Sequence, residues 1–395
     1  MKVKLENLSH DLADIIVAWD ENPNADYSYG GTRMVSPETS LIESQEICEH
    51  LMWAESLLKN KLINAALREG ALDHYSERLP EGFLESTVGG ARCVIRPKDQ
   101  SIMDILVQPN HQDWEPTISP IFESIGSFLN QKQGKIKLTP DFGRFAGLAD
   151  VLNLFTPHSL GIACDKGGCG GKSSYSATGI IAAIEVLGLD QRKAGRVTLI
   201  GAAGAMGGDV LKYLQHENYQ NLAVCDLAYD DINSGITPPE NLFTCSSKSG
   251  AFTVDCLERG GLIVATTVGQ ELENSFWEII PKGSTLLLAH NRAVPAGEVG
   301  KQLMQRIQER DIFALPGQVL TLGGALTSRV EWFWRQNNLG VPFDKQLAHL
   351  VVADVVKFLV TKIQRLAKSS STTPYESMLQ YVGMESLMAP PTTVR

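Results

Sequence analysis

The sequence has no long hydrophobic run and no cluster of positive charge, and each absence excludes a class of protein. No window approaches the roughly 18 consecutive apolar residues of a membrane-spanning helix. No run of about five Lys and Arg residues occurs, and 35 basic against 45 acidic side chains give a net charge of -10. A nucleic-acid-binding surface therefore has no electrostatic support. We expect the partner to be a small molecule, with neither nucleic acid nor membrane bound.

Cysteine is scarce, and the N-terminus lacks the features of an export signal. Glu6, His10 and Asp11 interrupt the stretch where a secretory signal peptide has a continuous apolar core. We therefore expect a cytoplasmic protein. Seven cysteines scattered through 395 residues do not form the framework of a small disulfide-rich domain, so reduced thiols are expected.

The composition that is present is typical of a globular protein, with 43% hydrophobic and 20% charged residues. A chain of this length can bury two separate cores. In residues 1–158, Glu43–Ile63 repeats apolar residues at helical spacing, which predicts an amphipathic helix. Ala91–Ile95 and Ile102–Val107 are expected to be strands, and a helix is expected around Ile118–Leu129.

The second part of the chain, residues 159–335, alternates short apolar segments with helical patterns. The expected strands are Val197–Ile200, Leu222–Cys225, Leu262–Thr266, Thr285–Leu288 and Ile312–Leu315. This alternation predicts a parallel sheet covered on both faces, in a doubly wound α/β domain. Residues 336–395 are expected to form C-terminal helices that pack back on the protein, followed by a loosely attached tail.

A glycine-rich turn follows the first of these strands and opens a helix. Gly201, Gly204 and Gly207 have the spacing GxxGxxG, which differs from the commoner GxGxxG of dinucleotide-binding domains. Asp226 ends the next strand, where a carboxylate can accept hydrogen bonds from the ribose hydroxyls. We predict a Rossmann-type domain that binds NAD, with NADP less favoured because no Arg lies near Asp226. The alternative is a structural turn without a ligand.

Two other patterns near residue 170 are weaker. Gly171, Lys172 and Ser173 match the end of a phosphate-binding loop, but the glycine required at its start is Lys166. Cysteine and histidine residues nearby have none of the common zinc spacings, so no metal is expected.

Five segments in the order of the chain resemble the glutamate, leucine, phenylalanine and valine dehydrogenases. They are GGTRM at 30–34, TPDFG at 139–143, SATG at 176–179, AHN at 289–291, and GGA at 323–325 followed by Glu331 and Trp332. The resemblance implies reversible oxidative deamination of an L-amino acid to a 2-oxo acid. It also implies a homo-oligomer assembled through the N-terminal domain, which would bind the substrate, with the nicotinamide meeting the substrate in a cleft between the domains.

The resemblance also assigns roles to individual residues. Asp141 would move protons, and Lys59 or Lys61 would hold the substrate carboxylate. Thr178 and Asn291 would contribute to cofactor binding, and Gly31 and Thr321 to substrate binding; Thr321 stands where the family has asparagine.

The largest departure from the family is at its GGGK segment, where this chain has GGAR at 89–92. The family lysine activates water, whereas a guanidinium remains protonated and is suited to holding a carboxylate. Arg92 therefore leaves three hypotheses open. The protein is an amino-acid dehydrogenase with altered chemistry, a nucleotide-binding pseudoenzyme with a regulatory or scaffolding role, or a biosynthetic enzyme that modifies a 2-oxo acid or imine. Lys98 or Lys172 could replace the missing base.

Overall fold

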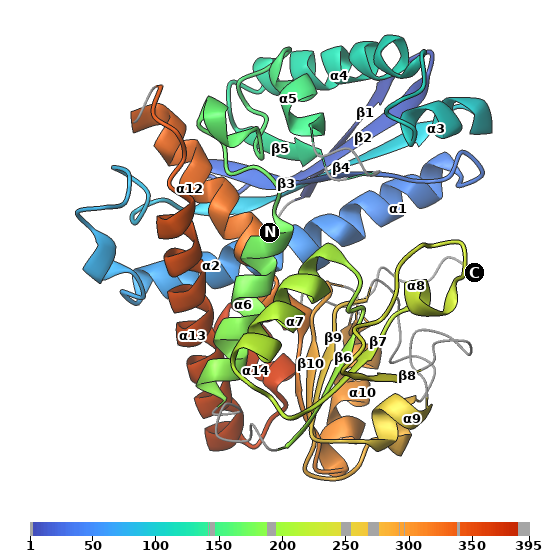
Figure 1. The fold of residues 1–395 in the computed structure, drawn as a ribbon. Coiled ribbons are helices and arrows are strands. Elements are labelled where there is room, and N and C mark those ends of the chain that lie inside the picture. The colour runs from blue at the N-terminus through green and yellow to red at the C-terminus, as the bar shows by residue number, and fades with distance from the viewer. Residues whose placement is uncertain are drawn as a thin grey trace. The chain divides into compact units, whose positions relative to one another are not determined.

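The structure, a computed structural model, describes residues 3–140, 142, 147–187, 195–245, 254–267, 276–291, 293–295, 297–337 and 340–385. The chain divides into two compact units (Figure 1). Unit 1 comprises residues 1–172 and 325–348, and unit 2 comprises residues 173–324 and 349–395. The division into folding domains expected from the sequence stays a prediction, because proximity of residues does not test independent folding.

Unit 1 contains a five-stranded mixed sheet. Its strands are β1 (Val3–Ser9), β2 (Ala13–Asp20), β3 (Tyr27–Met34), β4 (Val88–Pro97) and β5 (Ile136–Pro140), in the order β1-β2-β4-β3-β5. Strand β3 runs parallel to both β4 and β5, whereas β2 is antiparallel to β1 and β4. Because β3 and β5 are adjacent and parallel, side chains at alternate positions of both strands share one face.

Helices cover both faces of this sheet. Helices α3 (Gln100–Leu106), α4 (Trp114–Gln131) and α5 (Leu148–Asn153) pack over a core that includes Ile15, Ile118 and Phe122. On the other face, α1 (Leu41–Leu51), the π-helical segment η1 (Met52–Leu57) and α2 (Leu58–Arg68) form one continuous helix. The helix expected over Glu43–Ile63 is thus confirmed. The short 3-10 helices of unit 1 are η2 (Asp73–Tyr75) and η3 (Cys164–Lys166).

The strand expected over Ile102–Val107 is wrong, because this segment forms α3. The Asp99 side chain caps the helix by accepting a hydrogen bond of 3.0 Å from the Ile102 N–H. A short apolar run does not distinguish a strand from a helix, and the cap decides between them here.

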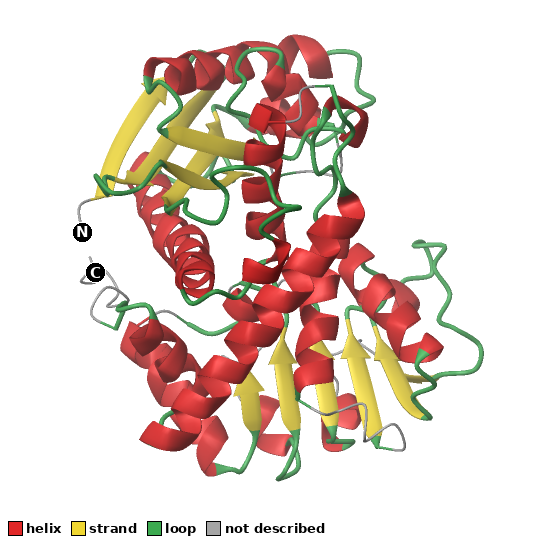
Figure 2. Ribbon diagram, turned by 90° about the vertical axis from the view of Figure 1, so that its left-hand side faces the viewer, coloured by secondary structure: helices red, strands yellow, loops and turns green. Residues whose placement is uncertain are grey.

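Unit 2 contains a six-stranded parallel sheet with helices on both faces (Figure 2). Its strands are β6 (Arg196–Ile200), β7 (Asn221–Cys225), β8 (Phe243–Cys245), β9 (Leu262–Ala265), β10 (Thr285–Leu288) and β11 (Phe313–Leu315). The order β11-β10-β9-β6-β7-β8 is that of the dinucleotide-binding doubly wound fold. The predicted α/β class with a Rossmann-type domain is confirmed.

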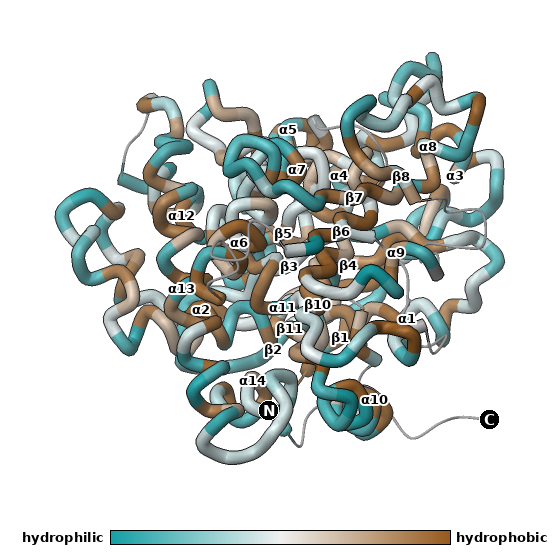
Figure 3. The backbone as a smooth tube through the Cα atoms, turned by 60° about the horizontal axis from the view of Figure 1, so that its bottom comes forward, coloured by the Kyte–Doolittle hydropathy of each residue, from teal (hydrophilic) through white to brown (hydrophobic). Residues whose placement is uncertain are grey.

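The remaining elements are mainly helices. They are α6 (Ser173–Val186), α7 (Ala205–His216), α8 (Leu227–Asp230), α9 (Val254–Glu258), η6 (Phe276–Ile279), α10 (Gly297–Glu309), α11 (Gly317–Leu320), α12 (Gly323–Asn337), α13 (Lys345–Ser370) and α14 (Pro374–Tyr381). Figure 3 shows the hydropathy along the chain, with hydrophobic segments on strands of both sheets. In the described part of the chain, no helix is both long enough and apolar enough to cross a membrane.

The prediction of a loosely attached tail is wrong for the residues up to the end of α14. Thr373 and Glu376 form a capping box at the start of this helix, and Tyr375, Met378 and Leu379 are fully buried. The apolar residues of this segment therefore belong to a core and are not isolated. Residues 386–395 lie outside the described residues.

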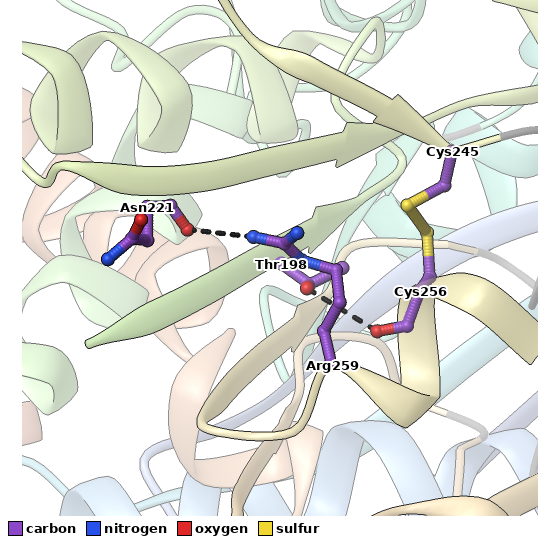
Figure 4. Close-up of a disulfide and its surroundings, with 5 residues drawn as sticks. All are labelled: Thr198, Asn221, Cys245, Cys256 and Arg259. Atoms are coloured by element: carbon purple, nitrogen blue, oxygen red, sulfur yellow. Dashed lines mark hydrogen bonds between the residues drawn. A yellow bond between two sulfur atoms is a disulfide. The ribbon is translucent and has the colours of Figure 1, made fainter.

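The expectation that all seven cysteines are reduced is wrong for one pair. Cys245, at the end of β8, forms a disulfide with Cys256 of α9, with 5.8 Å between the Cα atoms (Figure 4). The strand and helix that hold the two residues are brought together by the fold, which the sequence spacing did not indicate. Cys48, Cys93, Cys164, Cys169 and Cys225 are free thiols.

Candidate active site

The glycine turn of unit 2 has the backbone geometry of a phosphate-binding turn. Gly201 follows β6 with φ of 83°, a left-handed conformation that side chains disfavour. A Cβ on Gly207 would lie 2.0 Å from the Gly201 carbonyl oxygen, so only glycine allows α7 to begin this close to the turn. Gly204 is the N-cap residue of α7. The N-terminus of this helix directs N–H groups and a positive dipole end toward an anion.

Asp226 lies directly beside this turn. One carboxylate oxygen accepts a hydrogen bond of 2.8 Å from the Ala203 N–H within the turn, and the other accepts one of 2.9 Å from the Ala228 N–H at the start of α8. The structure therefore brings Asp226 together with the three glycines. A carboxylate oxygen can accept more than one hydrogen bond, so these backbone contacts are compatible with a role of Asp226 in binding ribose hydroxyls.

The other residues of unit 2 singled out from the sequence form two separate pairs. Asn291 accepts a hydrogen bond of 2.9 Å from the Thr321 hydroxyl. Thr178 on α6 lies 2.7 Å from a ring nitrogen of His349 on α13. The structure thus brings Asn291 and Thr321 together, whereas the nearest polar contact of Thr178 is with a C-terminal helix.

In unit 1, Lys172 forms the centre of a polar cluster. Its Nζ donates hydrogen bonds of 2.8 Å to the Tyr29 hydroxyl on β3 and 2.6 Å to Thr139 Oγ1 on β5. The Tyr29 hydroxyl in turn donates to Ser328 on α12 over 2.8 Å. The amine therefore contacts two strands that are distant from it in the sequence, and α12 joins the cluster through the Tyr29 hydroxyl.

A buried carboxylate holds the loop that carries Lys172. Glu331 on α12 is fully buried and accepts hydrogen bonds from the N–H groups of Gly161 at 2.8 Å and Cys169 at 3.0 Å. Arg335, one turn later, lies 3.6 Å from the same carboxylate. Glu331 thus fixes the approach of residues 161–172 to the sheet.

The surroundings of Lys172 keep its amine charged. Burial lowers the pKa of Lys172, but Tyr29, Cys169 and Glu331 offset this effect and the pKa is raised overall. At neutral pH Lys172 is therefore a cation. A permanently charged amine is suited to holding a carboxylate or stabilising developing negative charge, and it is a poor general base.

Arg92 on β4 lies beside Gly31 but is paired within the protein. Its Nη1 is 3.3 Å from Glu55 Oε2 on η1, and the two side chains are 5% and 3% exposed. A Cβ on Gly31 would lie 3.0 Å from Arg92 Nη1. In the described part of the chain, Arg92 Nε and Nη2 have no hydrogen-bond partner, so two donor nitrogens of the guanidinium are unused.

The structure shows less about the two remaining candidate catalytic residues, Lys59 and Asp141. Lys59 is 8% exposed on α2. Asp141 lies outside the described residues, directly after β5. The signal for Lys172 was present in the sequence as the GGK segment before α6, but the partners that define its role come from β3, β5 and α12.

Comparison with solved structures gives confident matches over almost the whole chain. L-tryptophan dehydrogenase from Nostoc punctiforme has a TM-score of 0.65 and 13% identity, covering 98% of this chain and 95% of that chain. The chain has the fold of the amino-acid dehydrogenases. Glutamate dehydrogenase from Peptoniphilus asaccharolyticus has a TM-score of 0.61 and 16% identity, covering 97% of this chain and 89% of that chain.

A third match is the Leu-bound hetero-hexameric glutamate dehydrogenase from Thermus thermophilus, with a TM-score of 0.60 and 12% identity over 96% of this chain and 87% of that chain. Comparisons with protein-family models and with curated protein sequences give no match. At these identities the likeness extends to the fold alone.

Proposed function

We propose that the protein is an NAD-dependent oxidoreductase that acts on an L-amino acid, a 2-oxo acid or the related imine. The observation that carries this proposal is the glycine turn joined to Asp226 in a sheet of dinucleotide-binding order. The amino-acid dehydrogenase fold supports the substrate class.

The cofactor would be held by unit 2. Glycine at positions 201 and 207 lets the turn pack closely against the start of α7, where a pyrophosphate would accept hydrogen bonds from the N–H groups of the helix, and Asp226 would accept the ribose hydroxyls. Thr178 and Asn291 are proposed to contribute further contacts. When bound, the nicotinamide exchanges a hydride with Cα of the substrate.

Unit 1 would hold the substrate. We assign to Lys172 the contact with the substrate carboxylate, because its amine is charged and already carries the hydroxyls of Tyr29 and Thr139 as neighbours. Asp141 is proposed to move protons. The roles of Lys59, Arg92, Gly31 and Thr321 in substrate binding remain part of the proposal.

The positive charge of Lys172 and Arg92 favours a reaction other than oxidative deamination. Hydrolysis of an imine requires a base that activates water, and neither a raised-pKa lysine nor a guanidinium supplies one. This observation favours a biosynthetic enzyme that reduces or condenses a 2-oxo acid or imine over an enzyme adapted to oxidative deamination.

The test is a screen of NADH oxidation with a panel of 2-oxo acids, with and without ammonia. We expect turnover with at least one acid. Turnover that requires ammonia would indicate an amino-acid dehydrogenase, and turnover without ammonia would indicate direct reduction. NADH binding without turnover of any acid would contradict an enzymatic role and favour a nucleotide-binding protein.

Assembly is a separate part of the proposal. The Thermus thermophilus neighbour is a hetero-hexamer, and we propose a homo-oligomer for this chain. Sedimentation analysis should give a mass several times the 43.1 kDa of one chain. A stable monomer would contradict this part alone.

The choice of cofactor is tested at Asp226. We expect Asp226→Asn to weaken NADH binding by roughly tenfold, because the charged hydrogen bonds to ribose are lost. NADPH should be affected less, since repulsion of the 2'-phosphate is also removed. Fluorescence titration with both cofactors measures the two changes, and Asp226→Ala should show the same preference.

The matched control is Asp230→Asn, an exposed residue on the same short helix. It should leave both affinities unchanged. Equal losses of NADH and NADPH affinity in both Asp226 variants would show that the side chain only stabilises the turn.

A further inference from the structure

Unit 1 contains a second cavity, separate from the Lys172 cluster. It has a volume of about 470 Å³, and the residues that give it chemical character are Tyr27, Lys137, His158, Trp332 and Phe333. Tyr27 and Lys137 each lie two residues before Tyr29 and Thr139 on β3 and β5. The cavity therefore adjoins the same face of the sheet, about 7 Å farther back along the strands.

The walls of the cavity are aromatic. The ring centroids of Tyr27 and His158 lie 6.1 Å and 6.0 Å from that of Trp332, and Phe333 completes the lining. Rings in this arrangement favour a flat apolar group.

Polar atoms in the cavity retain unused hydrogen-bonding capacity. The Tyr27 side chain is buried, with 3% exposure, and its hydroxyl has no hydrogen-bond partner among the described residues. The same holds for His158 Nδ1 within the described part of the chain. Lys137 is 2% exposed, and its Nζ donates 2.9 Å to the Gly134 carbonyl oxygen, which uses one of its three protons.

Lys137 lies against the Trp332 ring and near two other cations, Arg335 and Lys135. The Lys137 Nζ lies 3.4 Å from the ring centroid of Trp332. Burial, followed by Arg335 and Lys135, lowers the pKa of Lys137 to about 7. Burial, followed by Lys137 and Arg335, lowers the pKa of His158 to about 4, so His158 is neutral at physiological pH.

Acidic groups are present in the cavity lining, but they do not act as a counter-charge for the Lys137 amine. Asp26 and Glu85 line the cavity, and Asp26 accepts a hydrogen bond of 2.8 Å from the Thr87 N–H. Neither carboxylate contributes to the shift in the Lys137 pKa. Since neither carboxylate stabilises the charge of Lys137, a negative group placed beside its amine would do so.

We propose that this cavity is a binding site for a small organic carboxylate with a flat apolar body. The carboxylate would accept hydrogen bonds from Lys137 Nζ and the Tyr27 hydroxyl, and the flat group would lie against Trp332. This site is independent of the proposed catalytic function, and its ligand is not the substrate held by Lys172.

The probe for this site is benzoate, titrated into the full-length protein by calorimetry. Lys137→Met retains the length of the side chain without its charge and should weaken benzoate binding by roughly tenfold or more. Lys135→Met is the matched control, because Lys135 is exposed and only two residues away. At pH 6, where Lys137 is largely protonated with or without Lys135, this variant should bind benzoate within about twofold of the unchanged protein, and benzyl alcohol should not bind.

Two further measurements keep the test decisive. Tyr27→Phe removes only the unpartnered hydroxyl and should weaken benzoate severalfold, so it serves as the test if Lys137→Met does not fold. Benzoate affinity should also fall as pH rises from 6 to 9, because Lys137 loses its proton while the hydroxyl of Tyr27, whose pKa is raised by burial, keeps its proton.

Failure of this proposal is distinguishable from failure of the proposed function. Absence of benzoate binding at millimolar concentration, or equal affinity in the Lys137→Met and Lys135→Met variants, would overturn the carboxylate site. Neither result depends on NADH oxidation.

Discussion

Lys172→Met is expected to lower kcat/KM by about 10–150-fold for the acid identified in the substrate panel. The charged amine is assigned to the substrate carboxylate, and a charge-assisted hydrogen bond contributes about 1.5–3 kcal/mol. Since a carboxylate contact is made in both ground state and transition state, the loss should appear mainly as a higher KM. Steady-state kinetics with varied acid and saturating NADH measure it.

Lys166→Met provides the matched control for this experiment. Lys166 belongs to the same loop, is 56% exposed, and pairs with Asp150 over 3.0 Å. Its replacement should change kcat/KM less than twofold. A Lys172→Met variant that is folded and has unchanged KM and kcat would remove Lys172 from the site.

Arg92→Met should destabilise the protein by about 3–5 kcal/mol, because it leaves the buried carboxylate of Glu55 without its closer partner. The free energy of unfolding of the protein, from chemical denaturation monitored by tryptophan fluorescence, measures this loss. Replacing both members of the pair, in Glu55→Leu with Arg92→Met, should recover most of it, since two apolar side chains need no counter-charge.

Arg33→Met is the control that distinguishes the buried Arg92–Glu55 pair from a partly exposed charge near the same carboxylate. Arg33 lies 3.6 Å from Glu55 Oε2, but its side chain is 36% exposed, so we expect a loss of about 1 kcal/mol or less. Equal losses in the Arg33 and Arg92 variants would contradict the assignment of Arg92 as the principal partner of Glu55.

Sequence patterns predicted unit 2 more fully than unit 1. The parallel strands of unit 2 are buried on both faces, so each is a short apolar run followed by a helical pattern. Strand β8 was missed because Phe243–Cys245 is not a continuous apolar run, and only its last residue is buried. In unit 1, Ala13–Asp20 was not recognised as a strand, because a continuous apolar run is compatible with either a helix or a strand.

The glycine turn with Asp226 could be predicted from the sequence, whereas the Lys172 cluster could not. Gly201, Gly207 and Asp226 lie on consecutive elements, so a local motif was enough to group them. Lys172 meets Tyr29, which is 143 residues earlier, only because β3, β5 and α12 are brought together by tertiary packing. Sequence spacing carries no information about such a contact, and the resemblance pointed to Arg92 instead.

The bonds from Glu331 to the Gly161 and Cys169 amides determine how the loop before α6 should fluctuate. Five of the twelve residues 161–172 are glycine, and a free segment of this composition would exchange its amide protons with solvent almost at once. Because a single carboxylate from α12 accepts both N–H groups, these two amides can exchange only when that helix detaches. Deuterium uptake at Gly161 and Cys169 should therefore follow the opening of α12, and each opening would release Lys172 while the sheet remains folded.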